Sequence, residues 1–137
     1  MAIDPAQLTH LLRRTEYIAR PSRIAALQGL PTLDAAIDDI LNFPATPAVP
    51  SYLQSDIDGA GWDQYVFATK WWFDLMAFDS TRPLQEKMTL FWHGHFTSSN
   101  DKINSTYAMV KQNQLYRVNA VGNFQALTQA KIGRAHV

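Results

Sequence analysis

Aromatic residues are concentrated in one segment of the chain, where their spacing is that of a helix. Ten of the sixteen Phe, Trp and Tyr residues lie between positions 62 and 96. At about 100° per residue, one face of a helix over residues 62–76 carries these side chains: Trp62, Tyr65, Val66, Thr69, Trp72, Phe73 and Met76. The only continuous polar stripe is formed by Asp63, Lys70 and Asp74. We therefore expect a central core helix that is mostly buried.

Helix signals also cover most of the remaining chain. Asp4 and Thr32 are good N-cap residues, and Gly29 is suited to close a helix in the left-handed conformation. Further helices are expected over residues 22–28, 83–97, 104–120 and from 123 onward, with a turn at 79–81. No strand pattern and no internal repeat is found in the sequence. The sequence thus predicts an all-α fold, a multi-helix bundle-like fragment of a larger helical protein.

Proline and glycine divide the chain into parts. Residues 44–61 contain three Pro and two Gly and few large apolar residues, which predicts a linker or long loop. This segment separates the N-terminal helices of residues 1–43 from the aromatic-rich core helices of residues 62–131.

The last six residues, 132–137, read Ile-Gly-Arg-Ala-His-Val. The adapter commonly ligated to DNA for short-read sequencing encodes this string and then a stop codon. We therefore expect residues 132–137 to be an adapter-derived artefact that must be excluded from reasoning about the fold. The chain would then be a truncated fragment, of metagenomic origin, of a longer protein.

Composition excludes several classes of function. Lys and Arg total 12, Asp and Glu total 12, and the chain has no basic run, so we expect no nucleic-acid partner. The absence of Cys excludes disulfide scaffolds, zinc knuckles and thiol catalysis. No apolar stretch is long enough to span a membrane, and no secretory signal is recognisable. From this chain by itself we expect a cytoplasmic location.

Two histidines stand out in the FWHGHF motif of residues 91–96. His93 and His95 could bind a transition metal, but residues two apart on a helix point about 200° from each other. They could share an ion only if the helix breaks at Gly94; otherwise they have separate roles. A structural interpretation is favoured, in which each is an interior histidine that hydrogen bonds to a neighbouring helix.

Amide side chains form a second group of candidates in and after residues 111–114. They are Gln112, Asn113, Gln114, Asn119 and Asn123. They could form a buried polar network that fixes helix register, which is the favoured interpretation, or they could line a ligand cleft. Arg13, Arg14 and Arg117 could bind a carboxylate or phosphate, although arginines at helix ends more often complement the helix dipole.

The chain resembles the N-terminal part of the bacterial family called domain of unknown function 1800, over residues 8–131. The resemblance rests on these blocks: HLLRR at 10–14, WW at 71–72, RPLQEKMTLFWHGHF at 82–96, KQNQL at 111–115 and GNF at 122–124. It implies a largely helical protein several times longer, often exported in relatives and frequently encoded beside a hydrolase-like protein, a possible partner. It implies no established activity. Two departures from the family are expected: no leader is recognisable, and residues 15–19 read TEYIA where relatives commonly have Gly-Phe-Gly.

These observations leave two hypotheses for function. The first is a non-catalytic helical scaffold or interaction module of a larger protein, without a cofactor. The alternative is the N-terminal part of a metal-dependent enzyme that uses His93 and His95. Because helices built to pack against absent segments expose apolar surface, we also expect a contiguous apolar patch.

Overall fold

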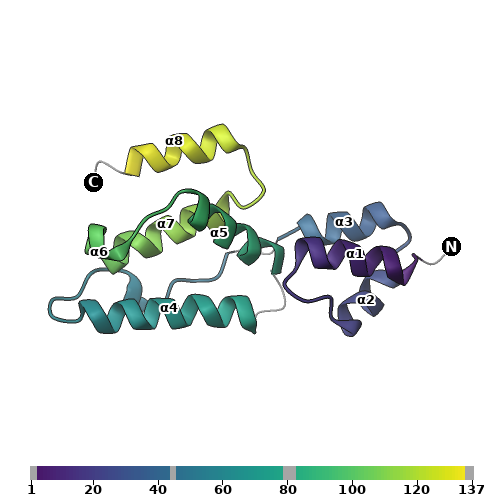
Figure 1. Ribbon diagram of the computed structural model, residues 1–137, viewed down its shortest axis with the longest axis horizontal. Coiled ribbons are helices and arrows are strands. Elements are labelled where there is room, and N and C mark those ends of the chain that lie inside the picture. The colour runs from purple at the N-terminus through teal and green to yellow at the C-terminus, as the bar shows by residue number, and fades with distance from the viewer. Residues whose placement is uncertain (1–2, 44–45, 79–82, 135–137) are drawn as a thin grey trace.

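The structure is a computed structural model that describes residues 3–43, 46–78 and 83–134 (Figure 1). Its helical elements are α1 (Pro5–Thr15), α2 (Pro21–Gln28), α3 (Leu33–Leu41), the 3-10 turn η1 (Ser51–Leu53), α4 (Gly61–Ala77), α5 (Pro83–His95), α6 (Asn100–Ile103), α7 (Thr106–Val118) and α8 (Phe124–Arg134). No strand occurs in the described ranges, which confirms the predicted all-α class. The predicted turn at 79–81 and residues 135–137 of the predicted adapter tail lie outside these ranges.

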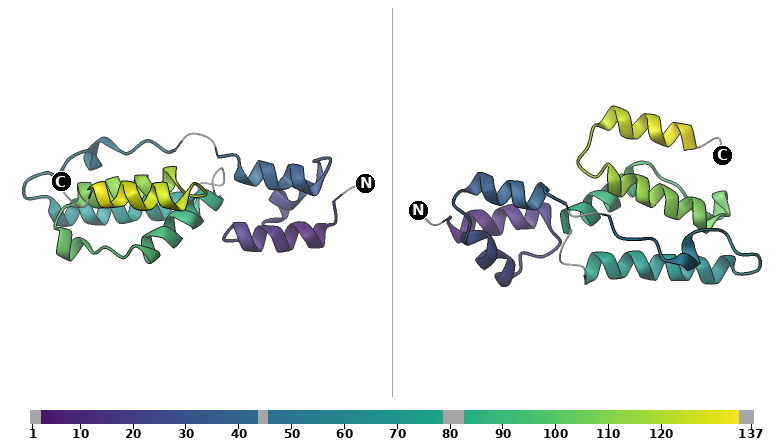
Figure 2. Two further views of the ribbon diagram at one scale, coloured as in Figure 1. Left: turned by 90° about the horizontal axis from the view of Figure 1, so that it is seen from above. Right: turned by 180° about the vertical axis from the view of Figure 1, so that it is seen from behind.

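Helices α1 to α3 form a lobe at one end of the molecule (Figures 1 and 2). The predicted caps are confirmed, since the side chains of Asp4 and Thr32 accept hydrogen bonds from Ala6 N (2.9 Å) and Ala35 N (3.1 Å). The amphipathic faces of the three helices meet in a buried core whose members from this lobe are Ile3, Leu8, Leu12, Leu27, Ala36 and Ile40. The lobe therefore follows the apolar spacing of the sequence.

The predicted left-handed closure of α2 at Gly29 is wrong. Gly29 has φ −71° and ψ −11°, within the right-handed region. Its N–H donates to Ala26 O over 3.2 Å, so the last turn of the helix tightens in the 3-10 manner. This bond satisfies a terminal carbonyl without any positive φ.

Helix α5 joins the N-terminal lobe to the remaining helices. Leu84, in its first turn, belongs to the lobe's apolar core. Lys87 Nζ donates to the carbonyl oxygens of Arg13 (3.2 Å), in the last turn of α1, and of Glu16 (2.9 Å), which follows that helix. The C-terminal end of α1 is thus held by an ammonium group on α5.

Helix α7 lies between α4 and α8 and also packs against α5 (Figure 1). Its residues Leu115 and Tyr116 form a second apolar cluster with Leu127 of α8, against which Trp92 and Phe96 pack. Asn123 caps α8 by accepting from Ala126 N over 3.0 Å. α7 is the central helix of this part of the structure.

The prediction that the aromatic helix is mostly buried is wrong. Gln64 is the buried residue of α4, whereas Trp62, Val66 and Phe73 are 73%, 47% and 58% exposed. The other described helices cover one face of α4 and leave the opposite face in solvent. Helical spacing shows where the apolar side chains of α4 lie, but not which part of the chain covers them.

Gln64 holds the segment before α4 in place. Its Nε2 donates to the carbonyl oxygens of Tyr52 (2.7 Å) and Ser55 (2.9 Å), and its Oε1 accepts from Ile57 N (3.0 Å). Leu53 of η1 is buried. The described part of the predicted linker or loop is therefore irregular backbone fastened to α4 by one amide side chain.

Candidate functional site

A pocket of about 330 Å³ opens where α4, α5, α6 and α7 meet. It is lined by Tyr65, Ala68, Thr69, Trp71, Trp72, His93, Ser98, Ser99, Asn100, Thr106, Met109, Val110 and Asn113. Helix α4 supplies aromatic walls, and the other elements supply hydroxyl, amide and imidazole groups. The residues that line it include no Asp, Glu, Lys or Arg. Apolar walls with a few convergent polar groups are typical of small-molecule sites.

His93 contributes its imidazole to this pocket. The ring packs edge-to-face against Trp72, with 5.1 Å between the ring centroids. Burial lowers the pKa of His93 below its ordinary value of 6.5, because desolvation disfavours the charged ring. At neutral pH this side chain is therefore an uncharged hydrogen-bonding group.

Asn113 reaches the same pocket from α7. The residue is 7% exposed, and neither its Nδ2 nor its Oδ1 has a hydrogen-bond partner in the described structure. Asn100 Oδ1, also in the pocket lining, is buried without a partner. Leaving a buried polar group without a hydrogen bond costs about 1–3 kcal/mol in the free energy of folding, so such groups are rare in native proteins. The structure thus brings together one candidate from each of the two groups proposed from the sequence, His93 and Asn113.

The other amide candidates do not join one network. Gln112 Nε2 donates to Ser98 Oγ over 3.1 Å, at the edge of the pocket. Gln114 Nε2 is 3.5 Å from Pro47 O, and Asn123 caps α8. Because successive helix positions point in different directions, these side chains meet different surroundings, and the single polar layer predicted from the sequence is not formed.

His95 is exposed, which corrects its predicted interior position. Helix α5 continues through Gly94, so His93 and His95 point to different sides. His95 packs instead among aromatic rings, with 5.0 Å to the Phe96 ring and 5.9 Å to those of Phe91 and Trp92. It lines a separate, open hollow beside Tyr17 and Lys87. No group of three His, Cys, Asp or Glu residues suited to a metal occurs in the described part of the chain, and a metal bound to this pair stays a prediction.

A buried ion pair behind the pocket was missed by the sequence analysis. Arg117 Nε and Nη2 donate to Glu86 Oε1 (2.7 Å) and Oε2 (2.9 Å), and the side chains are 0% and 1% exposed. Of the two roles considered for Arg117, carboxylate binding is therefore found, with a carboxylate of its own chain, and the favoured helix-dipole role is corrected. One signal in the sequence could have indicated this pair. Arg117 follows the apolar residues Leu115 and Tyr116 on a helix, and an arginine buried inside the fold needs an acidic partner.

This ion pair also holds two walls of the pocket. Trp72 Nε1 donates to Glu86 Oε2 over 3.2 Å. The Arg117 guanidinium lies over the Trp71 ring, 5.3 Å from its centroid. The orientation of both indoles is therefore set by a charge pair that the pocket itself does not contain.

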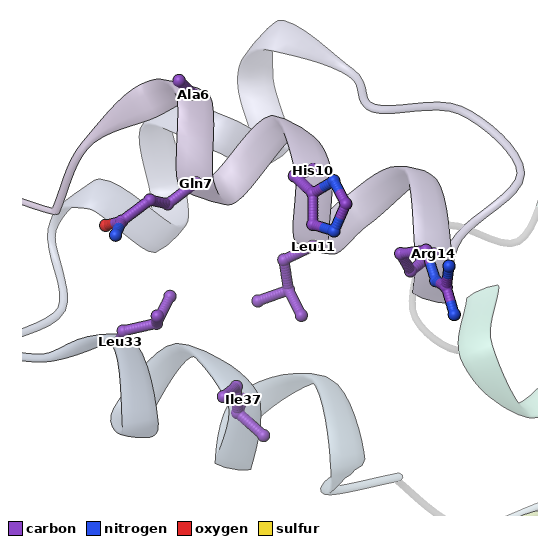
Figure 3. Close-up of a pocket in the computed structure, with 7 residues that line it drawn as sticks. All are labelled: Ala6, Gln7, His10, Leu11, Arg14, Leu33 and Ile37. Carbon is purple, nitrogen blue, oxygen red and sulfur yellow. The ribbon is translucent and has the colours of Figure 1, made fainter.

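A second cavity, an apolar groove of about 550 Å³, lies between α1 and α3 (Figure 3). Figure 3 shows Leu11 of α1 facing Leu33 and Ile37 of α3, with His10 and Arg14 along the same helix as Leu11. No unpartnered buried polar atom in the described residues belongs to this groove. The groove therefore offers fewer groups that could recognise a particular ligand than the pocket of His93 and Asn113 does.

A family model described as "Protein of unknown function (DUF1800)" matches residues 10–133. The chain belongs to the DUF1800 family. No curated protein and no solved structure matches it. The match to DUF1800 includes the pocket, the ion pair behind it and the whole of α4, and it confirms the resemblance found in the sequence. The described helices of this DUF1800 chain include none long and apolar enough to cross a membrane.

Proposed function

We propose that this chain is a helical scaffold of a larger protein, in which the outer face of α4 packs against another helix. The observation that carries the proposal is the exposure of Trp62, Val66 and Phe73, which we call the outer stripe of α4. A large contiguous apolar patch on a soluble surface marks an interaction site.

The spacing of the outer stripe favours a helix as the occupant. Trp62, Val66 and Phe73 belong to a series, completed by Thr69 and Met76, with intervals of four, three, four and three residues. This alternation keeps a seam on one side of a helix and is the pattern by which two helices pack along their length. The polar residues Asp63 and Lys70 run beside the seam, where they would stay in solvent.

The inner face of α4 supports the same interpretation. Trp71 and Trp72 contact the charge pair of α5 and α7, so this face is already occupied. A helix with apolar residues on two opposite faces and one narrow polar stripe is typical of a layer that is packed on both sides. The hydrolase-like protein expected from the resemblance stays a predicted partner.

Site-specific cross-linking tests the proposal. A photoreactive benzoylphenylalanine at position 73 in the complete gene product should cross-link to another helix of the same polypeptide, identified by mass spectrometry. The same residue at position 118, which is an exposed valine on α7, is the control and should give no such product. A cross-link to a separate polypeptide would replace the scaffold with an interaction module, and no cross-link from position 73 would overturn both.

A further inference from the structure

The pocket of His93 and Asn113 has the properties of a ligand site, and it lies apart from the outer stripe of α4. We propose that it binds a small, planar, uncharged molecule carrying a hydrogen-bond donor beside an acceptor, of the carboxamide or lactam class. The inference does not depend on the proposed scaffold role, because Trp62, Val66 and Phe73 of the outer stripe do not line the pocket.

The unpaired amide of Asn113 defines the polar edge of the ligand. One end of a carboxamide offers N–H donors and the other accepts, and here neither end has a partner. A ligand with an adjacent donor and acceptor would satisfy both ends with two parallel hydrogen bonds. Either orientation of the Asn113 amide presents the same pair of groups, so the inference does not depend on which end is nitrogen.

Asn100 adds a second polar contact. Its Oδ1 is buried in the lining without a partner and can accept one more hydrogen bond. The pocket therefore offers two acceptors and one donor group from asparagine side chains, which suits a primary amide better than a ketone or an ester. Hydrogen bonds from a ligand to these groups would remove the free-energy penalty of leaving them unpaired, which favours binding.

The lining explains why the ligand should be uncharged. Tyr65 and His93 are the titratable residues among those that line the pocket, and the lining includes no carboxylate, ammonium or guanidinium. A charged ligand would lose its hydration without a counter-charge. Arg117 does not line the pocket, and Glu86 already balances its charge.

The walls explain why the ligand should be planar. Trp71, Trp72 and Tyr65 of α4 line the pocket, and aromatic walls favour stacking or edge contacts with a flat ring. The indole N–H of Trp72 is already bonded to Glu86, so Trp72 offers ring surface and not a donor. Because the ion pair sets both indoles, the walls are arranged before a ligand arrives.

Binding of simple probes tests the inference on the 137-residue chain. Benzamide is the probe, benzoate has nearly the same shape with a negative charge, and toluene has the ring without the amide. Ligand-observed NMR should show benzamide binding with a Kd of about 1 mM, a reasonable value for so small a molecule, and at least about tenfold weaker binding of the other two. Chemical shifts of the Trp72 indole and the His93 ring should move with benzamide.

Substitutions on α7 test whether benzamide binds in this pocket. Asn113→Leu keeps a similar volume and removes both polar ends, and should weaken benzamide binding by about tenfold or more. Gln114→Leu, one residue further along α7, is the matched control, because its amide faces Pro47 and it does not line the pocket. Asn113→Ser serves if the leucine variant does not fold, and it should give the same loss.

Each other result overturns the inference. Equal affinities for benzamide and toluene would show that the pocket recognises only an apolar ring. An equal affinity for benzamide and benzoate would contradict the preference for an uncharged ligand. An unchanged affinity in folded Asn113→Leu, or no binding of benzamide up to 10 mM, would show that Asn113 does not form a ligand site.

Discussion

Glu86 of α5 and Arg117 of α7 face each other inside the protein through two hydrogen bonds of 2.7 and 2.9 Å. Both side chains are removed from solvent, so each has given up its hydration and relies on the other. The pair joins two helices that are distant in sequence and orients Trp71 and Trp72. One interaction therefore connects the packing of the helices to the shape of the pocket.

Replacing one member of this pair should destabilise the protein strongly. Glu86→Gln leaves the guanidinium buried without a counter-charge, and we expect a loss of about 3–5 kcal/mol in the free energy of unfolding. Replacing both residues, Glu86→Met with Arg117→Met, should cost much less, because no lone charge remains buried. Urea unfolding followed by circular dichroism measures both.

The exposed pair Lys70 and Asp74 on α4 is a matched control for this prediction. Lys70→Gln should change the free energy of unfolding by less than about 0.5 kcal/mol, since solvent screens surface ion pairs. A Glu86→Gln variant as stable as Lys70→Gln would contradict the buried pair.

Two tyrosines should ionise late in an alkaline titration. Partial burial of Tyr17, which is 40% exposed, and after it the negative charge of Glu86 raise its pKa to about 12. Burial likewise raises the pKa of Tyr116 to about 12, and its hydroxyl has no partner in the described structure. Tyrosinate absorbance at 295 nm should therefore show a component that titrates well above pH 10, and Tyr17→Phe and Tyr116→Phe should each reduce its amplitude.

The same two groups should make stability depend on alkaline pH. In the unfolded chain tyrosine loses its proton near the ordinary value of 10, whereas in the folded protein it keeps it until about 12. Between these values the unfolded state binds fewer protons, so stability falls as pH rises. A melting temperature that stays flat from pH 9.5 to 11.5 would contradict the raised pKa values.

The sequence predicted local features well because they depend on neighbouring residues. The caps at Asp4, Thr32 and Asn123 follow from side chains that bond within three positions, and the helices follow from apolar spacing. The family resemblance identified the same stretch as the family model.

Features that depend on contacts between distant residues were predicted less well. Burial of α4 was predicted wrongly, because helical spacing shows which face is apolar and not which neighbour covers it. The partner of Arg117 is 31 positions away in the sequence, and no local pattern connects them. His93 and Asn113 were both candidates, but only the packing of α5 beside α7 places them in one pocket.

His93 should make stability depend on acidic pH. Burial lowers its pKa in the folded state below the ordinary value of 6.5, so below about pH 6.5 the unfolded chain takes up a proton that the folded protein does not. Stability should fall as pH falls from 6.5 toward the lowered pKa, and His93→Gln should flatten this dependence. NMR titration of the ring protons gives the pKa directly, and a value at or above 6.5 would remove the basis of the prediction.

The metal-dependent alternative requires that His93 and His95 act together, and a titration with zinc tests this. Because α5 is unbroken through Gly94, the two rings point to different sides, and we expect no stoichiometric zinc binding by this chain. His95→Ala should also change the free energy of unfolding by less than about 1 kcal/mol, because an exposed side chain away from a buried network contributes little. Isothermal titration calorimetry on the wild type, His93→Ala and His95→Ala separates the cases. Tight equimolar binding that either substitution abolishes would mean that the end of α5 rearranges around a metal, and it would favour the enzyme hypothesis over the scaffold.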